Sequence, residues 1–385
     1  MLFTTLLYLS ALSYCLLFIA YRYGWSSTPR TVAPVPSPDH PFLSIVIPAR
    51  NEARHISDTL HSIIRNDYPS GRYEIILIDD YSDDDTGLIA RELFRSHPGI
   101  NGKVIFMKDI LGDDPALNAY KKKALETAIL TARGDYIVTT DADCIVPPGW
   151  LRHFAGVYTD PDVHFIMAPV SFIPAHRKDL CYYFQSVDFM TMQGITAASH
   201  TLRWGKMCNG ANLSFSREAF SAVGGYAGID HLASGDDMML MHKIAQQYPR
   251  ALSYLRHQGS IVHTPAQPGW KSFLNQRVRW ASKNGKYKDI PLTVNLLIVY
   301  LFNLLLFTGS VLACFRPSLW IHCLIILVIK ILSEQLLIVP VSRFYNKQKE
   351  LPYHVLLQPL HILYIITAGF LGMAGKYEWK GRVVR

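Results

Sequence analysis

The sequence predicts an α/β fold, in which a Rossmann-like, mainly parallel sheet is accompanied by membrane helices at both ends of the chain. Two observations carry this prediction. Between residues 42 and 143, short apolar runs alternate with segments of helical periodicity, which is typical of a parallel sheet flanked by helices. Towards both ends, uncharged stretches are long enough to cross a bilayer. With 385 residues, half of them hydrophobic, the chain has room for one or two domains.

The expected strands are apolar runs that each end in polar residues. The four runs begin at Phe42, Tyr73, Lys103 and Gly134, and segments with apolar residues at helical spacing separate them, at 51–66, 86–96 and 121–132. Ligands of parallel sheets bind at the carboxyl ends of the strands. We therefore expect one polar rim formed by three clusters, which are Arg50-Asn51-Glu52, Asp79-Asp80 and Asp141-Ala142-Asp143.

An acid pair, Asp141 and Asp143, directly follows the β-branched run at 136–140. Side chains two residues apart on an extended chain share a face, so both carboxylates are expected to point the same way. Two converging hard oxygen ligands suit Mg²⁺ or Mn²⁺, and Ala142 between them is expected to leave room for a bulky ligand. Taken alone, such a pair is more often a solvated acidic loop, so its meaning depends on the rest of the chain.

Four apolar stretches are candidate membrane segments. They cover 2–21, 290–315, 318–341 and, more weakly, 353–375. The third is broken by Lys330 and Glu334, which either pair with each other or line a groove for an acceptor. Because Arg22 follows the first stretch and no basic residue or small-residue cleavage site suggests a signal peptide, we expect an uncleaved anchor and a cytosolic central region.

The C-terminal tail leaves the topology open. Three C-terminal spans would place the tail at 376–385 outside, whereas its basic residues favour the cytosolic side. The segment at 353–375, which contains Pro359, is therefore either a third span or a re-entrant or interfacial hairpin.

Composition narrows the class of protein further. The six cysteines show no Cys-x-x-Cys spacing, which fits reduced cytosolic thiols better than disulfides or zinc. No basic–aromatic motif for nucleic acid occurs. The formal net charge of +8 suits an anionic membrane surface or a phosphorylated substrate.

Seven motifs between about Leu43 and Tyr287 resemble, in their order, those of the membrane-bound family 2 glycosyltransferases, which have the GT-A fold. The motifs are "SIVIPARNE", "ILIDDYSDDDT", "KKKAL", "TTDADC", "CNGANLSFSREAF", "SGDDMML" and "QRVRW". Together with the apolar stretches, the resemblance implies six segments. The first three are a transmembrane anchor (1–22), a Pro/Ser linker (23–40) and a GT-A domain that includes an interfacial QxxRW helix (41–288). The last three are two transmembrane helices (289–341), a cytosolic loop with a third C-terminal membrane segment (342–375) and a basic tail (376–385).

The resemblance also implies roles for residues that bind a nucleotide-sugar. Those expected to hold the nucleoside and the phosphates are Pro48, Ala49, Arg50, Glu52, Asp80, Lys121 and Asp141. Asp80 would accept a hydrogen bond from the uracil N–H. Lys121 or Lys122 would lie near the phosphates unless the three consecutive lysines are simply a solvated helix face. Asp143, helped by Asp141, would ligate Mg²⁺ or Mn²⁺.

Three further motifs imply the remaining roles. Asp237 would be the general base, with Asp236 supporting it or contacting the acceptor, although an acid here can also cap a helix. Asn212 would contact the acceptor or the sugar. In the QxxRW motif, Gln276, Arg279 and Trp280 would bind the donor, with Trp280 also against the sugar or acceptor; alternatively, the motif forms an amphipathic interfacial helix.

Together these inferences predict a multi-pass membrane enzyme whose catalytic domain is cytosolic, in the inner membrane if the cell is bacterial. It would be an inverting, metal-dependent glycosyltransferase that moves a sugar from a nucleotide-sugar, first of all a UDP-sugar, to a lipid or lipid-linked glycan. A polysaccharide synthase of the hyaluronan or poly-N-acetylglucosamine type is the alternative, although three or four membrane segments are few for a polymer channel. A non-catalytic membrane scaffold is more remote, because its signature would be missing acids.

Overall fold

The computed structural model describes residues 1–31, 40–112, 120–173, 179–229, 235–283, 289–373, 377–379 and 382–384. Its contacts divide the chain into two compact units. The first, which we call the helical unit, comprises Met1–Thr28, Pro174–Met207 and Ala266–Arg385. The second, the sheet unit, comprises Pro29–Ile173 and Cys208–Pro265.

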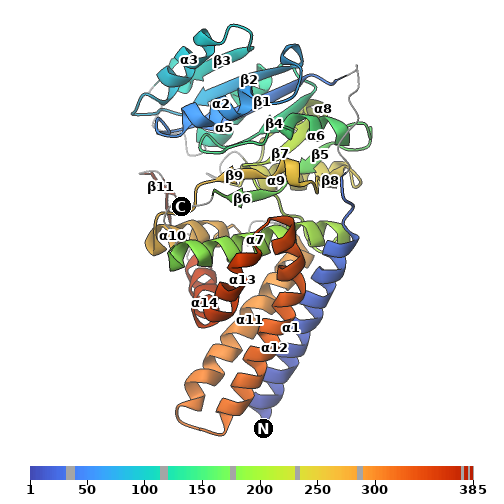
Figure 1. The fold of residues 1–385 in the computed structure, drawn as a ribbon, viewed down its shortest axis with the longest axis vertical. Coiled ribbons are helices and arrows are strands. Elements are labelled where there is room, and N and C mark those ends of the chain that lie inside the picture. The colour runs from blue at the N-terminus through green and yellow to red at the C-terminus, as the bar shows by residue number, and fades with distance from the viewer. Residues whose placement is uncertain are drawn as a thin grey trace. The chain divides into compact units, whose positions relative to one another are not determined.

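A seven-stranded sheet forms the centre of the sheet unit, in the order β3-β2-β1-β4-β7-β5-β8 (Figure 1). Its strands are β1 (Leu43–Ala49), β2 (Tyr73–Asp79), β3 (Gly102–Phe106), β4 (Tyr136–Thr139), β5 (Phe165–Met167), β7 (Leu213–Ser216) and β8 (Leu252–Tyr254). β1 pairs in parallel with β2 and β4, and β2 with β3, whereas β7 is antiparallel to β4 and β5. The predicted mainly parallel sheet is thus confirmed.

Helices cover this sheet where the sequence shows apolar residues at helical spacing. They are α2 (Ile56–Ile64), α3 (Thr86–Ser96), α4 (Met107–Leu111), α5 (Tyr120–Leu130), α6 (Trp150–Val157), α8 (Arg217–Ala222) and α9 (Asp236–Gln247). In α2, Ile56, Leu60 and Ile63 form the buried face. β1 and β2 are buried on both faces, as the strands of a covered parallel sheet should be. A smaller parallel pair joins β6 (Val170–Phe172) to β9 (Val262–Thr264).

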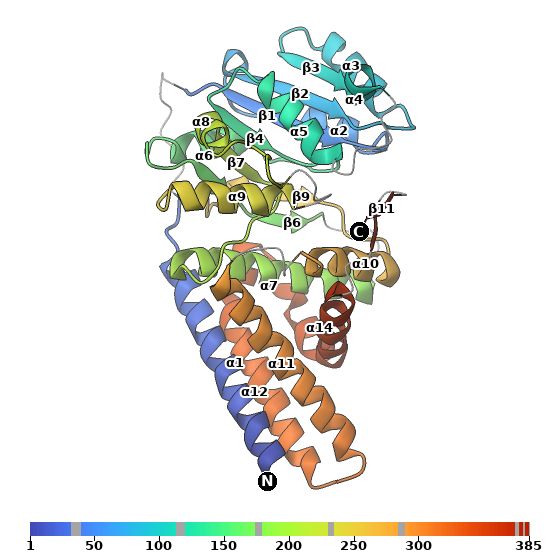
Figure 2. The same cartoon turned by 180° about the vertical axis from the view of Figure 1, so that it is seen from behind.

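Three helices of the helical unit are long and apolar enough to cross a membrane. They are α1 (Leu2–Ser27), α11 (Ile290–Ala313) and α12 (Leu319–Phe344), and they pack side by side (Figure 2). Two further helices, α7 (Leu180–Leu202) and α10 (Trp270–Ala281), run across one end of this bundle. Gly194 of α7 lies against Val341 of α12, where a Cβ would come within 2.6 Å of a valine methyl carbon.

The fourth apolar stretch is two helices rather than one. α13 (Leu351–Leu356) and α14 (Gln358–Met373) form a pair that is bent by 76°. Pro359 explains the break, because it has no N–H to donate to the carbonyl of Val355. α14 then leads to Gly372, whose Cβ would lie 2.6 Å from the Cβ of Ala281 at the end of α10. The two-stranded ladder of β10 (Tyr377–Trp379) and β11 (Arg382–Val384) follows.

A cluster of polar side chains, which we call the membrane polar cluster, lies buried between α1, α12, α13 and α14. Its members are Tyr14, Lys330, Glu334, His354, Gln358 and His361. Lys330 Nζ lies 2.6 Å from Glu334 Oε1 and 2.6 Å from Gln358 Oε1. The other carboxylate oxygen of Glu334 accepts from Gln358 at 2.6 Å and lies 2.9 Å from His354 Nε2. Lys330 and Glu334 therefore pair with each other, which was the first of the two predicted alternatives.

We predict that Glu334→Ala destabilises the protein by about 3–5 kcal/mol, because it leaves the ammonium of Lys330 buried without its counter-charge. Thermal unfolding in detergent measures the change. The matched control is Glu126→Ala, which removes an exposed partner of Lys123 at 2.8 Å and is expected to change the free energy of unfolding by about 0.5 kcal/mol or less. Equal melting temperatures for the two variants would contradict the prediction.

Candidate active site

The carboxyl ends of three neighbouring strands form one rim of the sheet unit. β1 lies between β2 and β4, with Ala49 opposite Asp79 and Val46 opposite Thr139. The residue after β2, Asp80, donates its N–H to the carbonyl of Ala49 at 2.8 Å. Because these strands are parallel, the cluster Arg50-Asn51-Glu52 after β1 lies beside Asp79-Asp80 at the end of β2. The third cluster, Asp141-Ala142-Asp143, follows β4 on the other side of β1.

The loop after β1 is fastened to the loop after β2. Arg50 Nη1 donates to the carbonyl of Asp80 at 2.9 Å, and the N–H of Glu52 donates to Thr86 Oγ1 at 2.8 Å. Asn51 has a φ of 54°, a left-handed conformation that asparagine tolerates better than most residues. Asp80 is 2% exposed. This arrangement fixes the residues that were predicted to hold a nucleoside.

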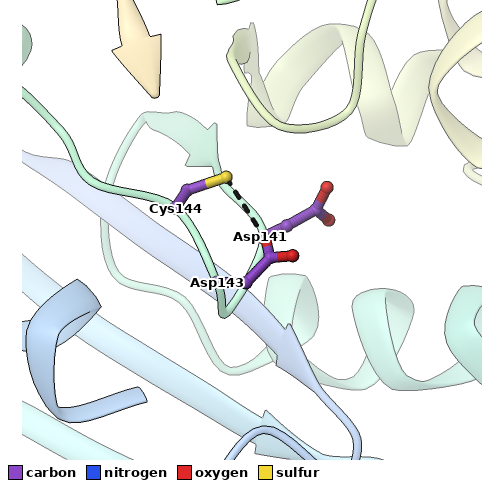
Figure 3. Close-up of side chains that lie close together, drawn as sticks. All are labelled: Asp141, Asp143 and Cys144. Carbon is purple, nitrogen blue, oxygen red and sulfur yellow. Dashed lines mark hydrogen bonds between the residues drawn. The ribbon is translucent and has the colours of Figure 1, made fainter. Parts of the chain in front are cut away.

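The acid pair lies in a turn, which corrects the predicted geometry. β4 ends at Thr139, and the N–H of Cys144 donates to the carbonyl of Asp141 at 3.2 Å. Asp141 and Asp143 approach each other because of this turn and not because of strand alternation (Figure 3). Ala142 is buried, and its carbonyl accepts from Thr59 Oγ1 at 2.9 Å. Its small side chain therefore fits the packing below the turn instead of opening the site.

The carboxylates of Asp141 and Asp143 and the sulfur of Cys144 offer ligand atoms within 4.8 Å of one another (Figure 3). Burial raises the pKa of the Cys144 thiol well above its usual value. The Cys144 sulfur lies 3.6 Å from Asp143 Oδ1, and as a soft atom it suits Mg²⁺ or Mn²⁺ less well than carboxylate oxygens do. The two carboxylates remain as hard oxygen ligands, which fit Mg²⁺ or Mn²⁺.

Lys121 connects this acid pair to the second one. Its Nζ, near the start of α5, lies 3.4 Å from Asp141 Oδ1 and 3.5 Å from Asp236 Oδ2. These residues, together with Asp237, are the charged lining of one small pocket, whose walls include Pro48, Tyr226 and Gly210. The structure thus brings together five of the predicted site residues, which come from four separate motifs.

Asp236 and Asp237 occupy the first turn of α9, directly after Gly235, whose φ of 83° suits glycine. Asp237 accepts from the N–H of Gly210 at 2.9 Å through one oxygen and from the N–H of Met238 at 2.8 Å through the other. These bonds hold its carboxylate at the pocket wall. Both predicted features of the motif are present, namely an acid in the pocket and the start of a helix.

Asn212 requires a correction, because it does not face the pocket. It is 0% exposed, and its Oδ1 accepts from the indole of Trp150 at 2.9 Å. Its amide nitrogen donates to the carbonyls of Pro169 and Ser260 at 2.7 and 2.8 Å. The side chain is committed to the fold, so we assign it a structural role instead of the predicted contact with the sugar or acceptor.

Two further residues lie near the acids, namely Lys122, which was the predicted alternative to Lys121, and Tyr226, which was not predicted. Lys122 is buried and donates to the carbonyl of Ile229 at 2.7 Å, which fixes the chain that leads towards α9. Tyr226 lines the pocket, and burial, followed by the charges of Asp236 and Asp237, raises the pKa of its hydroxyl well above the usual value. Nothing in the local sequence distinguishes Lys122 from its two lysine neighbours, and Tyr226 belongs to none of the motifs.

The QxxRW motif lies on α10, within the helical unit. Gln276 Oε1 is buried without a hydrogen-bond partner among the described residues. The indole of Trp280 packs against the ring of Phe189 from α7, with centroids 6.1 Å apart. Gln276, Arg279 and Trp280 are each partly exposed. The predicted helix is therefore present, and its motif residues lie within the helical unit.

Comparison with known families decides the class of this protein. The family model described as glycosyl transferase family 21 matches residues 4–385. The chain belongs to this family. Family 21 membership agrees with the predicted glycosyltransferase and with a mainly parallel sheet that carries apolar helices at both ends.

Two curated relatives and one solved structure place the chain more closely. It is 27% identical over 247 residues to a probable glycosyltransferase, YdaM, of Bacillus subtilis, covering 63% of this chain and 55% of that protein. It is 29% identical over 118 residues to the beta-monoglucosyldiacylglycerol synthase of Trichormus variabilis, covering 31% and 24%. The chain thus spans about half the length, or less, of these relatives.

The solved structure is the mannosyltransferase PcManGT from Pyrobaculum calidifontis in complex with GDP-Man and Mn²⁺. The TM-score is 0.58 at 19% identity, with 96% of this chain and 98% of that chain covered. This similarity confirms the fold class.

The three consecutive lysines allow a sharp test of the pocket. We expect Lys121→Met to lower kcat/KM for sugar transfer about 10- to 100-fold, because a charged hydrogen bond contributes about 1.5–3 kcal/mol and Lys121 pairs with both Asp141 and Asp236. Lys123→Met, on the exposed side of α5, is the matched control and should leave kcat/KM unchanged. Lys122→Met should instead lower the melting temperature. If the variants at 121 and 123 had equal activity, Lys121 would have no role in the pocket.

Proposed function

We propose that this protein is an inverting, metal-dependent glycosyltransferase that moves a sugar from a nucleotide-sugar, with UDP-sugars as the first candidates, to a lipid or lipid-linked glycan at the cytosolic face of a membrane. One observation carries the proposal. In a chain of glycosyl transferase family 21, Lys121 joins an acid of the Asp141–Asp143 pair to an acid of the Asp236–Asp237 pair inside one pocket. A metal-bound donor and a proton acceptor are thereby available side by side.

The donor half of the site is the rim at the ends of β1 and β2. The contact between Arg50 and the Asp80 carbonyl and the bond from Glu52 to Thr86 support a preformed cleft for a nucleoside. In the proposed complex, Asp80 accepts a hydrogen bond from the base, as the uracil N–H would offer, and Lys121 lies near the phosphates. Pro48 and Ala49 form the end of β1 beside them.

Asp143 and Asp141 are the proposed ligands of Mg²⁺ or Mn²⁺. When bound, the ion acts as a Lewis acid that stabilises the negative charge of the departing diphosphate. The turn that brings the two carboxylates together supports this assignment. The mannosyltransferase PcManGT, with the same fold class, was solved with Mn²⁺.

Asp237 is the proposed general base, and Asp236 is proposed to support it or contact the acceptor. The N–H groups of Gly210 and Met238 orient the Asp237 carboxylate, so that one oxygen can take the proton of the acceptor hydroxyl as that hydroxyl attacks the anomeric carbon. One displacement inverts the anomeric centre, and no covalent nucleophile is required. Gln276, Arg279 and Trp280 complete the proposed donor-binding residues.

A lipid-type acceptor is favoured over a growing polysaccharide. Among the residues that the structure describes, three helices, or four if the bent pair is one span, are apolar enough to cross a membrane, and this number is small for a polymer channel. A relative that acts on a lipid, the monoglucosyldiacylglycerol synthase, points in the same direction. A non-catalytic scaffold would be expected to have lost acids, whereas Asp80, Asp141, Asp143 and Asp237 are all present.

The proposed topology has three spans, α1, α11 and α12, and one re-entrant hairpin formed by α13 and α14. The 76° bend between α13 and α14, and the position of Gly372 beside Ala281 of α10, support a hairpin that returns to the side on which it entered. In this topology the basic tail lies on the cytosolic side, together with Arg22 near the C-terminal end of α1. The basic tail then lies on the side that its charge favours, which three C-terminal spans would not allow.

The catalytic proposal is tested with purified protein in detergent, UDP-sugars, Mn²⁺ or Mg²⁺ and a lipid extract, with products identified by mass spectrometry. We expect Asp143→Asn to lower turnover at least about 100-fold, because the ion supplies several kcal/mol of charge stabilisation. Asp237→Asn should lower turnover about 100- to 10,000-fold, with donor affinity retained. Chelation of divalent ions should abolish transfer by the unmodified protein.

Asp67→Asn is the matched control, because Asp67 is a partly exposed acid that pairs with Arg152 at 3.0 Å. It is expected to transfer at the normal rate. Transfer that persists in Asp143→Asn, or in the presence of a chelator, would refute the metal-dependent mechanism.

The topology is tested with Cys314, which is exposed in the turn between α11 and α12, and with a cysteine added after Arg385. A membrane-impermeant maleimide applied to intact cells should label Cys314, whereas the added cysteine should react only after permeabilisation. Labelling of both from outside would show that α13 and α14 form a third C-terminal span.

A further inference from the structure

A buried ion pair involves Arg277, which occupies the first variable position of the QxxRW motif. Arg277 stands between Gln276 and Arg279 in the sequence, yet it is 2% exposed in its side chain. Its Nη2 lies 2.8 Å from Oδ2 of Asp188 on α7, whose side chain is 8% exposed. The pair therefore connects α7 to α10 inside the helical unit.

Aromatic rings surround the guanidinium of Arg277. Its central carbon lies 4.3 Å from the ring centroid of Trp280 and 5.0 Å from that of Phe273. Nη1 lies 3.6 Å from the sulfur of Met192. A planar, weakly hydrated guanidinium is suited to stacking on rings in this way, whereas a lysine ammonium is not. The contact with Trp280 is the shortest of the ring contacts.

Two residues pack against Trp280, and both depend on α7. Phe189 lies on α7, and Arg277 pairs with Asp188 of α7. Phe189, next to Asp188 in the chain, packs against the indole with centroids 6.1 Å apart. Arg277, fixed by Asp188, stacks on the same indole. In addition, Asp188 Oδ1 lies 3.9 Å from Nε2 of His361 on α14. The carboxylate therefore stands where α7, α10 and α14 meet.

A buried ion pair is a costly way to stabilise a fold. Desolvation of two charges offsets their attraction, and apolar side chains of similar volume often stabilise as well or better. Fixing one arrangement of the surrounding groups is what such a pair can do and an apolar pair cannot. Here the group fixed most closely is the indole of Trp280.

We propose that Asp188 and Arg277 are positioning residues that hold the Trp280 indole in the orientation required for sugar transfer. This inference rests on the proposed function, in which Trp280 binds the donor sugar or the acceptor. The ion pair sets the rotation and depth of the indole through Arg277, and Phe189 supports it.

The decisive experiment is a double-mutant cycle between Arg277→Lys and Trp280→Ala in the full-length protein, with radiolabelled UDP-sugar to detect slow transfer. Arg277→Lys retains the charge and removes the planar stack. We expect it to lower kcat/KM about 10- to 100-fold, which is the scale of a small misplacement of a binding group. In the Trp280→Ala background it should have no further effect, because the group that it positions is gone. Arg152→Lys, in the partly exposed pair with Asp67, is the control and should be fully active.

A second variant separates positioning from folding. The double variant Asp188→Asn/Arg277→Met removes both charges. Its melting temperature should be close to that of the unmodified protein, whereas its kcat/KM should stay low. Recovery of activity together with stability would overturn the inference. So would activity of Arg277→Lys within about twofold of normal, or an equal loss in both backgrounds of the cycle.

The same variants distinguish this inference from the proposed function. Full activity of Trp280→Ala, together with loss of activity in Asp143→Asn, would overturn the positioning role and leave the proposed transferase intact. Full activity of Asp143→Asn would refute the proposed function itself.

Discussion

The pocket of the sheet unit depends on the ion pairs that the ammonium of Lys121 forms with Asp141 and Asp236. Asp141 and Asp236 belong to motifs that are 95 residues apart in the printed sequence, and each approaches the same nitrogen within 3.5 Å. Without that charge, the carboxylates lining one pocket would repel one another. The ammonium between them offsets part of this repulsion. An excess of negative charge still remains, which is the condition for binding a divalent cation.

In the helical unit, too, buried charged side chains are paired with an opposite charge. Lys330 and Glu334 are buried against each other, and Gln358 and His354 satisfy the remaining oxygen of the carboxylate. Arg277 and Asp188 form the corresponding pair between α7 and α10. The Arg277–Asp188 pair joins two helices directly. Lys330 and Glu334 both lie on α12, and their hydrogen bonds to His354 and Gln358 connect this helix to α13 and α14.

The sequence was sufficient for the elements whose length gave a periodic signal. β1 to β4, α2, α3 and α5 were predicted because their apolar positions repeat over enough residues. β5, β6, β8 and β9 have three residues each, too few for any alternation to be recognised. The antiparallel β7 lies within a predicted motif, but its pairing with β4 depends on tertiary contacts. The turn at Asp141 was missed because a strand that ends two residues earlier leaves no trace in the side-chain pattern.

Individual site residues were predictable when their chemistry was unusual for their position, and not otherwise. Acids at strand ends are conspicuous, whereas Asn212 satisfies three buried hydrogen bonds with a side chain that would suit a sugar equally well. Arg277 was overlooked because a motif with two arginines does not reveal which one is turned inwards. Which of the two arginines is buried depends on residues of another helix, here Phe189 and Asp188 of α7. A local sequence pattern does not contain these residues.

The division of the chain has a consequence for the proposed enzyme. The chain passes between the units four times, at 28/29, 173/174, 207/208 and 265/266, and the QxxRW helix is packed within the helical unit. α10 contacts α14, and α7 contacts α1 and α12. A fragment limited to residues 41–288 would therefore retain the motif but remove the helices against which α7 and α10 pack. Asp188, Arg277 and Trp280 would lose their common support, so the apolar helices maintain the arrangement of the QxxRW motif as well as anchoring the chain.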